Sequence, residues 1–247
     1  EAGYDTLNEA LAVESEGYTI VLLKDLEVTA QINVIKSVTI EGAGHTIKAN
    51  NASWLTDNSN KHLLNIQNTS NVTVQNLTLD SNNQAYGNQA YSATGVAFND
   101  VTMVNSKGAG LTVNRSTVTA ENLTTSDNAW GGVNVDGGAP HFTLTGNSTL
   151  NENNQIWAEK ANGPAVVTAT GYYCHLIKDE IKNEEFYAWS TSVSDTAVAK
   201  VKVGGVDVYY TSLEKALSEN AGTVEITLVK DATLDSGATK VPQGQTR

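Results

Sequence analysis

The chain has 247 residues and a mass of 26.2 kDa, enough for one large all-β domain or for a domain and a fragment. Only 17% of its residues are charged, and 15 basic against 27 acidic groups leave a net charge of −12. Because binding to a nucleic-acid duplex needs a basic surface that displaces counterions, we expect no nucleic-acid partner. No apolar run approaches the roughly 18 residues of a membrane span, so we expect no membrane insertion.

Cysteine usage and overall composition narrow the class of protein further. Cys174 is the only cysteine in the sequence, which excludes an intramolecular disulfide framework and a multi-cysteine zinc site. We expect no metal and no other cofactor, with bound Ca²⁺ as an open alternative that no motif indicates. Abundant Asn, Thr, Ser and Gly with few prolines are typical of a secreted, repetitive β protein. The chain begins at Glu1 rather than at methionine, and we expect it to be a processed or excised piece.

The N-terminal segment predicts a cap followed by the first turns of a repeat. Residues 6–14 have the pattern of a short amphipathic helix, with Thr6 as N-cap and Glu9 three residues later. A strand is expected over residues 19–23, and alternating apolar residues over 28–47 predict the first turns. Residues 48–61 and 84–94 exceed the regular turn and are expected to form loops that project from it.

Three short strand patterns then recur with a step of 22 to 25 residues, each reading apolar, polar, apolar. The first column comprises 72–74, 96–98, 118–120, 142–144 and, more weakly, 166–168. The second comprises 77–79, 101–103, 123–125 and 148–150, and the third comprises 64–66, 111–113, 133–135 and 156–158. Three strands per turn at this period predict a parallel β-helix solenoid.

Asparagine and aspartate recur at the bends between these columns, where their tolerance of left-handed backbone geometry favours tight turns. One row comprises Asn76, Asp100, Asn122 and Asn147. A second row comprises Asn82, Ser106, Asn128 and Asn153. Repetition at fixed positions favours ladders of stacked side chains over ordinary loop residues.

The cap pattern occurs a second time, 206 positions further along. Residues 210–217 match residues 4–11, and residues 226–231 match residues 20–25. Residues 201–208 read as a hairpin with a Gly-Gly turn. Helical spacing through Ile177, Ile181 and Trp189 predicts a helix that closes the first solenoid. We therefore expect a β-helix over 1–175, a helical closing segment over 176–195, and over 196–247 a small α+β segment that starts a second repeat.

The cap at residues 4–25 and the first turn at residues 38–47 carry a resemblance to a known group. Over about residues 4–170 the chain resembles right-handed parallel β-helix proteins of the pectate-lyase-like superfamily, especially repeat-bearing surface proteins of Gram-positive bacteria. The resemblance implies an extracellular location at the bacterial cell surface or cell wall and a tandem array of such modules. The superfamily's catalytic motifs do not carry over: Gly44–Thr46 only partly matches one of them, and Arg115 has no evident aspartate cluster.

One face of the predicted solenoid gathers residues suited to carbohydrate. The register of the third column makes Asp136 and Glu159 neighbours on successive turns, about 4.8 Å apart. The residues expected around this pair are Trp157, Trp130, Asn134, Asn114, Arg115, Lys160 and Asp127. Aromatic faces stack on sugar rings, and carboxylates and amides bind hydroxyl groups. Two such carboxylates could also act as general acid and as nucleophile or base. The alternative is that Asp136 and Glu159 are exposed charges balanced by Lys160, with Trp157 shielding a sheet face.

The sequence therefore predicts a non-catalytic adhesive or glycan-binding module of a larger tandem-repeat protein. Its expected partners are a host or environmental glycan or surface protein and the neighbouring repeats. The alternative is a secreted polysaccharide-active hydrolase or lyase that uses Asp136 and Glu159. A spacer role and an ice-binding role for the outward threonine rows, such as Thr73 and Thr119, are further readings.

Overall fold

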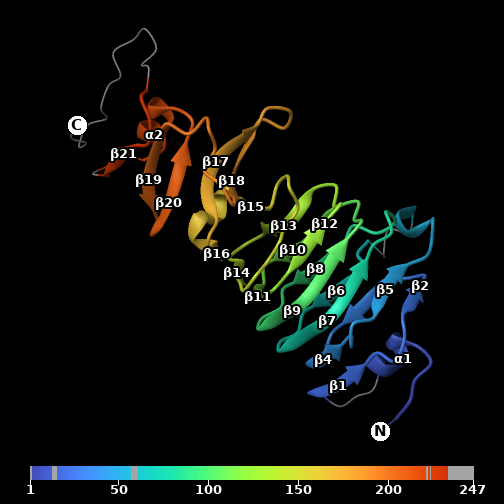
Figure 1. The fold of residues 1–247 in the computed structure, drawn as a ribbon. Helices are drawn as coiled ribbons and strands as arrows, with labels where there is room; N and C mark the ends of the chain where they lie inside the picture. The colour runs from blue at the N-terminus through green and yellow to red at the C-terminus, as the bar shows by residue number, and fades with distance from the viewer. Residues whose placement is uncertain (1, 13–15, 57–60, 221, 223, 233–247) are drawn as a thin grey trace. The chain divides into compact units, whose positions relative to one another are not determined.

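The computed structural model describes residues 2–12, 16–56, 61–220, 222 and 224–232 (Figure 1). The chain divides into two compact units, the first formed by residues 1–156 and 166–170 and the second by residues 157–165 and 171–247. The division differs from the predicted boundaries after residues 175 and 195. It falls within strand β15 (Ile156–Glu159), which the sequence assigns to the last solenoid turn.

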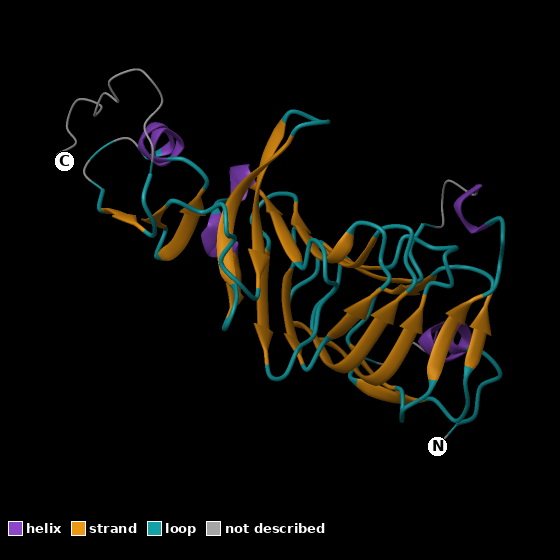
Figure 2. Ribbon diagram, turned by 45° about the horizontal axis from the view of Figure 1, so that its top comes forward, coloured by secondary structure: helices purple, strands orange, loops and turns teal. Residues whose placement is uncertain are grey.

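The first unit is a parallel β-solenoid of about six turns, and its first sheet contains the first and second strand columns. Figures 1 and 2 show its strands side by side along the solenoid. The strands that follow one another across this sheet are β1 (Tyr18–Val21), β4 (Val38–Glu41), β7 (Val72–Asp80), β9 (Val96–Val104), β11 (Thr117–Glu121), β14 (His141–Thr145) and β16 (Val167–Ala169). Shorter strands pair alongside them: β2 (Leu26–Val28), β5 (Thr46–Ala49) and β12 (Thr124–Ser126). In β7 and β9 both predicted columns run within one nine-residue strand.

The second sheet of this unit holds the third column. Its strands follow in the order β3 (Ile32–Val34), β6 (Leu64–Gln67), β8 (Asn88–Tyr91), β10 (Ala109–Asn114) and β13 (Gly131–Asp136). Strand β8 corrects the prediction of a projecting loop over residues 84–94, because it pairs in parallel with both β6 and β10. Asn88 takes the inward position that Leu64 and Leu111 occupy in the neighbouring turns, which hid the strand from a search for apolar triplets. Between β5 and β6 lies the short 3₁₀ helix η1 (Trp54–Thr56); residues 57–60 of the other predicted loop lie outside the described residues.

Alternation of apolar and polar residues places one side of every strand in the interior. In β7 and β9, Val74 and Phe98 are fully buried and stack in register across the turns. Between the inward residues, Asn76 and Asp100 adopt left-handed φ angles of 50° and 54°. The prediction of left-handed bends in this row is confirmed for these two residues and for Asn122, whereas Gly146 takes that geometry beside Asn147.

Side chains in these rows also bond along the solenoid. Asn122 Nδ2 donates to Asp100 Oδ1 at 2.9 Å, and the Asn147 backbone N–H donates to Asn122 Oδ1 at 2.8 Å. In the second row, Asn128 Nδ2 donates to Asn151 Oδ1 at 3.1 Å, so the row continues through Asn151 rather than through the predicted Asn153. Each ladder thus satisfies backbone and side-chain groups at bends that the strand ladders leave open.

Helix α1 (Leu7–Ala12) begins as predicted, although residues 13–14 of the predicted helix lie outside the described residues. The Thr6 backbone N–H donates to Glu9 Oε2 at 3.1 Å, and the Glu9 backbone N–H donates to Thr6 Oγ1 at 3.2 Å. This reciprocal capping box fixes the start of the helix. Leu7 and Ala10 are buried, so the helix turns its apolar face to the solenoid interior.

The second unit replaces the predicted closing helix by an antiparallel hairpin, β17 (Tyr173–Asp179) and β18 (Glu184–Ser190). The prediction from helical spacing is wrong, because Ile181 lies in the turn with 98% of its surface exposed while Trp189 is 3% exposed. Asp179 accepts hydrogen bonds from the backbone N–H groups of Ile181 and Lys182, which fixes that turn. The aromatic residues of β18 favour a strand.

The remainder of the second unit adds a second hairpin and the repeated cap. Its elements are β19 (Ala199–Val203), β20 (Val206–Tyr210), α2 (Leu213–Glu219) and β21 (Ile226–Leu228). The sheet runs in the order β21, β19, β20, β17, β18, with β20 parallel to β17 and β19 antiparallel to both its neighbours. Two 3₁₀ helices, η2 (Lys160–Asn162) and η3 (Pro164–Val166), precede β16. Val166 belongs to η3, so Phe142 pairs with Val167 and not with Val166. The last strand of the first column, predicted over 166–168, is therefore shifted by one residue.

Candidate functional site

The outward face of the second solenoid sheet carries rows of polar side chains in strict register. Strand β10 pairs with β13 so that Thr112 lies beside Asn134 and Asn114 beside Asp136. On the preceding turns, the same rows continue through Gln89 and Tyr91 of β8 and through Asn65 and Gln67 of β6. Parallel pairing spaces such residues about 4.8 Å apart, so the face carries a regular two-row array of polar groups. In the first row Asn65, Thr112 and Asn134 are buried and Gln89 is half-buried, and the second row, which comprises Gln67, Tyr91, Asn114 and Asp136, is half-buried.

Asp136 is held at the C-terminal end of its strand by its neighbours in this array. Asn134 Nδ2 donates to Asp136 Oδ2 at 3.2 Å, and the Arg115 backbone N–H donates to the Asp136 carbonyl at 3.2 Å. The Arg115 guanidinium lies over the Tyr91 ring, 5.9 Å from its centroid, and its Nη1 donates to the Tyr91 hydroxyl at 3.4 Å. Arg115 thus forms a cation–π pair at this end of the face, a contact that the sequence does not predict because Tyr91 falls in the supposed loop.

A second aromatic contact lies where the strands of this sheet begin. Trp130 precedes β13, stacks on Tyr86 with ring centroids 5.4 Å apart and an interplanar angle of 30°, and remains 51% exposed. Tyr86 precedes β8, which lies two solenoid turns before β13. The Trp130 backbone N–H donates to the Gly108 carbonyl at 3.1 Å. Asp127, also predicted for the site, is exposed and adopts a left-handed φ of 55° at the bend before buried Asn128. Aromatic side chains therefore stand at both ends of the strands that carry the polar rows.

The remaining predicted site residues belong to the second unit. Trp157 meets Phe186 edge to face, with ring centroids 5.8 Å apart. Asn162 Nδ2 donates to Glu159 Oε2 at 3.4 Å. Because Asp136 belongs to the first unit and Glu159 and Trp157 to the second, their proximity stays a prediction.

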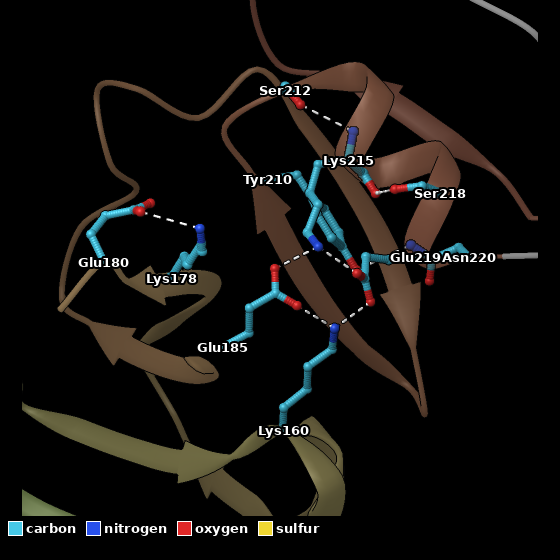
Figure 3. A network of polar contacts seen from close by, with 10 residues as sticks. All are labelled: Lys160, Lys178, Glu180, Glu185, Tyr210, Ser212, Lys215, Ser218, Glu219 and Asn220. Atoms are coloured by element: carbon cyan, nitrogen blue, oxygen red, sulfur yellow. Dashed lines mark hydrogen bonds and ion pairs between the residues drawn. The ribbon is translucent and has the colours of Figure 1, made fainter. Parts of the chain in front are cut away.

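Lys160 takes part in a four-membered ion-pair ring within the second unit (Figure 3). Its Nζ lies 2.5 Å from Glu185 Oε2 and 2.6 Å from Glu219 Oε2, and Lys215 Nζ lies 2.5 Å from the other oxygen of each carboxylate. Ion pairing with Lys160 and Lys215 lowers the pKa of Glu185 and of Glu219. Partial burial opposes the charge on Lys160, but its two carboxylate partners outweigh burial and raise its pKa. The geometry assigns Lys160 to a structural ring that joins η2, β18 and α2.

A shallow depression of about 420 Å³ lies over the bend between the first two columns, away from the predicted residues. Its polar lining includes Glu41, Asn76 and Asp100. Hydrogen bonds from Gln75 and from the Ala43 backbone N–H lower the pKa of Glu41, and Asn76 Nδ2 also donates to this carboxylate at 2.9 Å. These bonds hold the Glu41 carboxylate against the row of Asn and Asp residues at the bend. Glu41 is therefore part of the structure of the bend.

Among the described residues, no group of three or more His, Cys, Asp or Glu side chains is placed to hold a metal ion. None of the helices in the described ranges is both long and apolar enough to cross a membrane.

Stacked parallel strands, joined by left-handed Asn and Asp bends, define the first unit as a parallel β-solenoid. Residues 62–220 match the family described as the right-handed β-helix region, and the chain belongs to this family. No curated protein and no solved structure matches the chain.

Proposed function

We propose that this chain is a non-catalytic, glycan-binding adhesive module exposed on a bacterial cell surface, where it forms part of a tandem-repeat protein. The observation that carries the proposal is the two-row polar array on β6, β8, β10 and β13 with aromatic side chains at both ends of the strands. Sugars offer hydroxyl groups on their edges and C–H groups on their ring faces. The half-buried row of Gln67, Tyr91, Asn114 and Asp136, together with the exposed ring of Trp130, matches both features.

The charge of the chain favours a neutral glycan as ligand. The net charge of −12 repels polyanions at long range, and the one arginine within the array, Arg115, is engaged with Tyr91. Four residues of a strand extend over about 13 Å, so the rows suit a short run of sugar units that lies along or across the strands.

A glycan array probed with the whole chain tests this function. We expect binding to neutral glycans that falls about tenfold in Trp130→Ala or Tyr91→Ala, equivalent to about 1.4 kcal/mol of lost contact. Tyr173→Ala is the matched control, because Tyr173 is a 41% exposed tyrosine of the second unit. Equal losses in all three variants, or no binding to any glycan, would contradict the proposal.

The same preparation tests the enzymatic alternative. The proposal expects no new reducing ends and no unsaturated products when the chain is incubated with the glycans that it binds. Release of such products, abolished by Asp136→Asn and by Glu159→Gln, would identify a polysaccharide-active enzyme and overturn the non-catalytic assignment.

A further inference from the structure

Strand β1 ends the first solenoid sheet and has one open edge. It pairs in parallel with β4, and among the described strands none pairs with its other side. The Leu22 backbone N–H donates to the Glu41 carbonyl at 2.9 Å, so the backbone groups of Ile20 and Leu22 face β4. Because successive residues of a strand direct these groups to opposite sides, those of Val21 and Leu23 face the open edge.

The residues at this open edge also carry exposed apolar side chains. Val21 is 49% exposed and Leu23 is 87% exposed, although both lie in or directly after a strand. Exposed strand edges with apolar side chains attract further strands, and folded proteins usually cover them.

The second copy of the cap shows what covers the equivalent edge. Strand β21 is the counterpart of β1, and it pairs antiparallel with β19 of the preceding hairpin. The Val229 backbone N–H donates to the Val198 carbonyl at 2.9 Å, and Thr227 lies opposite Lys200. At the repeat offset, Val229 corresponds to Leu23 and Thr227 to Val21. The two residues whose backbone groups face the open edge in the first cap are therefore those that meet β19 in the second.

We propose that the open edge of β1 is the docking site for an antiparallel hairpin of the β19–β20 type supplied by a neighbouring repeat. The register follows from the second copy: the hairpin residue equivalent to Val198 lies opposite Leu23, and the one equivalent to Lys200 lies opposite Val21. The chemistry of the occupant follows as well. Its edge strand alternates small or branched apolar residues with lysines, as Ala199, Lys200, Val201 and Lys202 do, and its apolar side is buried, with Ala199 at 0% and Val201 at 1% exposure.

The repeat offset also fixes how the junction is tested, because Tyr210 ends the hairpin and corresponds to Tyr4. A fusion that places a second copy of residues 196–209 directly before Tyr4 recreates the junction in the natural register, with the rest of the chain intact. We expect hydrogen exchange of the Val21 and Leu23 amides to slow by about tenfold or more in the fusion relative to the unextended chain. A fusion with Lys200→Pro in the grafted copy is the matched control, because proline removes the N–H that meets the edge; it should lose this protection.

A cross-link reports the register directly, even where the grafted hairpin adds little stability. Cysteine at Leu23 and at the grafted copy of Val198 should form an intramolecular disulfide on mild oxidation, whereas cysteine at Leu23 and at the grafted copy of Val201 should not. Slowed exchange together with the selective cross-link supports the docking register. Unchanged exchange with no cross-link, cross-linking at both positions alike, or a covalent dimer in place of the intramolecular bond would overturn it. None of these outcomes depends on glycan binding.

Discussion

The two copies of the cap, residues 4–25 and residues 210–231, share a sequence pattern but use it differently. In the first, Glu9 closes a capping box with Thr6, and β1 continues a parallel sheet. In the second, Ser212 Oγ still accepts from the N3 backbone N–H at 3.0 Å, but Lys215 stands at the position of Glu9 and joins the ion-pair ring. One change of charge at the third helical position thus moves a residue from local capping to a contact with β18.

The comparison teaches that the cap has two separable parts. The helix start and its apolar face are common to both copies and depend only on nearby residues. The pairing of the strand and the contacts of the charged helix face depend on the elements that precede or follow the cap in the chain. A change in one copy can therefore be measured against the matching change in the other.

Removal of the apolar contact at the start of each helix should affect the first copy most. Leu7 is 5% exposed, whereas its counterpart Leu213 is only half-buried. We expect Leu7→Ala to lower the free energy of unfolding of the first unit by about 2–4 kcal/mol, and Leu213→Ala to cost its unit about half as much. Denaturant unfolding followed by hydrogen exchange of each unit measures both. Equal losses would show that the two helices are equally anchored.

Acidification should weaken the two units through different groups. Burial, with a smaller contribution from Lys61, lowers the pKa of His62 in the first unit to about 4. Between pH 6.5 and about 4 the unfolded chain binds a proton at His62 that the folded chain does not, so stability falls as pH falls, by at most about 1.4 kcal/mol per pH unit. His62→Gln should flatten this slope in the first unit, and His141→Gln, at an exposed histidine of the same unit, should leave it unchanged. A slope that persists in His62→Gln would assign it to other groups.

The ion-pair ring should matter to the second copy alone. We expect Glu219→Gln to cost the second unit about 1 kcal/mol at neutral pH, and less in 1 M salt. The pKa values of Glu185 and Glu219 are lowered below their usual 4.5, so the stability they supply is present above that pH and is lost as pH falls further. Once the pH is well below the lowered pKa values, the variant and the parent should therefore unfold alike. Glu9→Gln is the counterpart in the first cap, and its effect should be insensitive to salt.

The N-caps should give the smallest effects. Thr6→Ala and Ser212→Ala each remove one acceptor for a helix N–H and should cost about 0.5–1 kcal/mol. Because Thr6 is part of a reciprocal box, we expect the larger loss in the first copy. Hydrogen exchange in α1 and α2 measures it, and a larger loss at Ser212 would contradict this ranking.

The parallel solenoid and most of its register could be predicted from the sequence, because the repeat imposes the same side-chain alternation on each turn. The first column from Val72 to Phe142 and the bends at Asn76, Asp100 and Asn122 are examples. Prediction failed where a turn departs from the pattern. Inward Asn88 concealed β8, and Val166 entered a 3₁₀ helix beside Pro164. Spacing alone also misassigned residues 176–189, where the turn at Asp179 decides for a hairpin.

The candidate site was predictable only within a strand column. The neighbours Asn114 and Asp136 follow from the period, and the structure has them in register. Contacts between a strand and a bend or helix cannot be read from the sequence repeat. Stacking of Trp130 on Tyr86, the Arg115–Tyr91 pair and the use of Lys160 in the ring each depend on how bends and helices direct long side chains.

The lone thiol of the chain has a use of its own. Cys174 lies on β17 with 1% of its surface exposed, paired between β18 and β20, and burial raises its pKa. Thiol reagents attack the exposed thiolate, so modification of this residue requires the hairpin sheet to open. Since no other cysteine competes for the reagent, the rate of thiol labelling reports how often the hairpin sheet of the second unit opens. It reads these openings without any introduced probe.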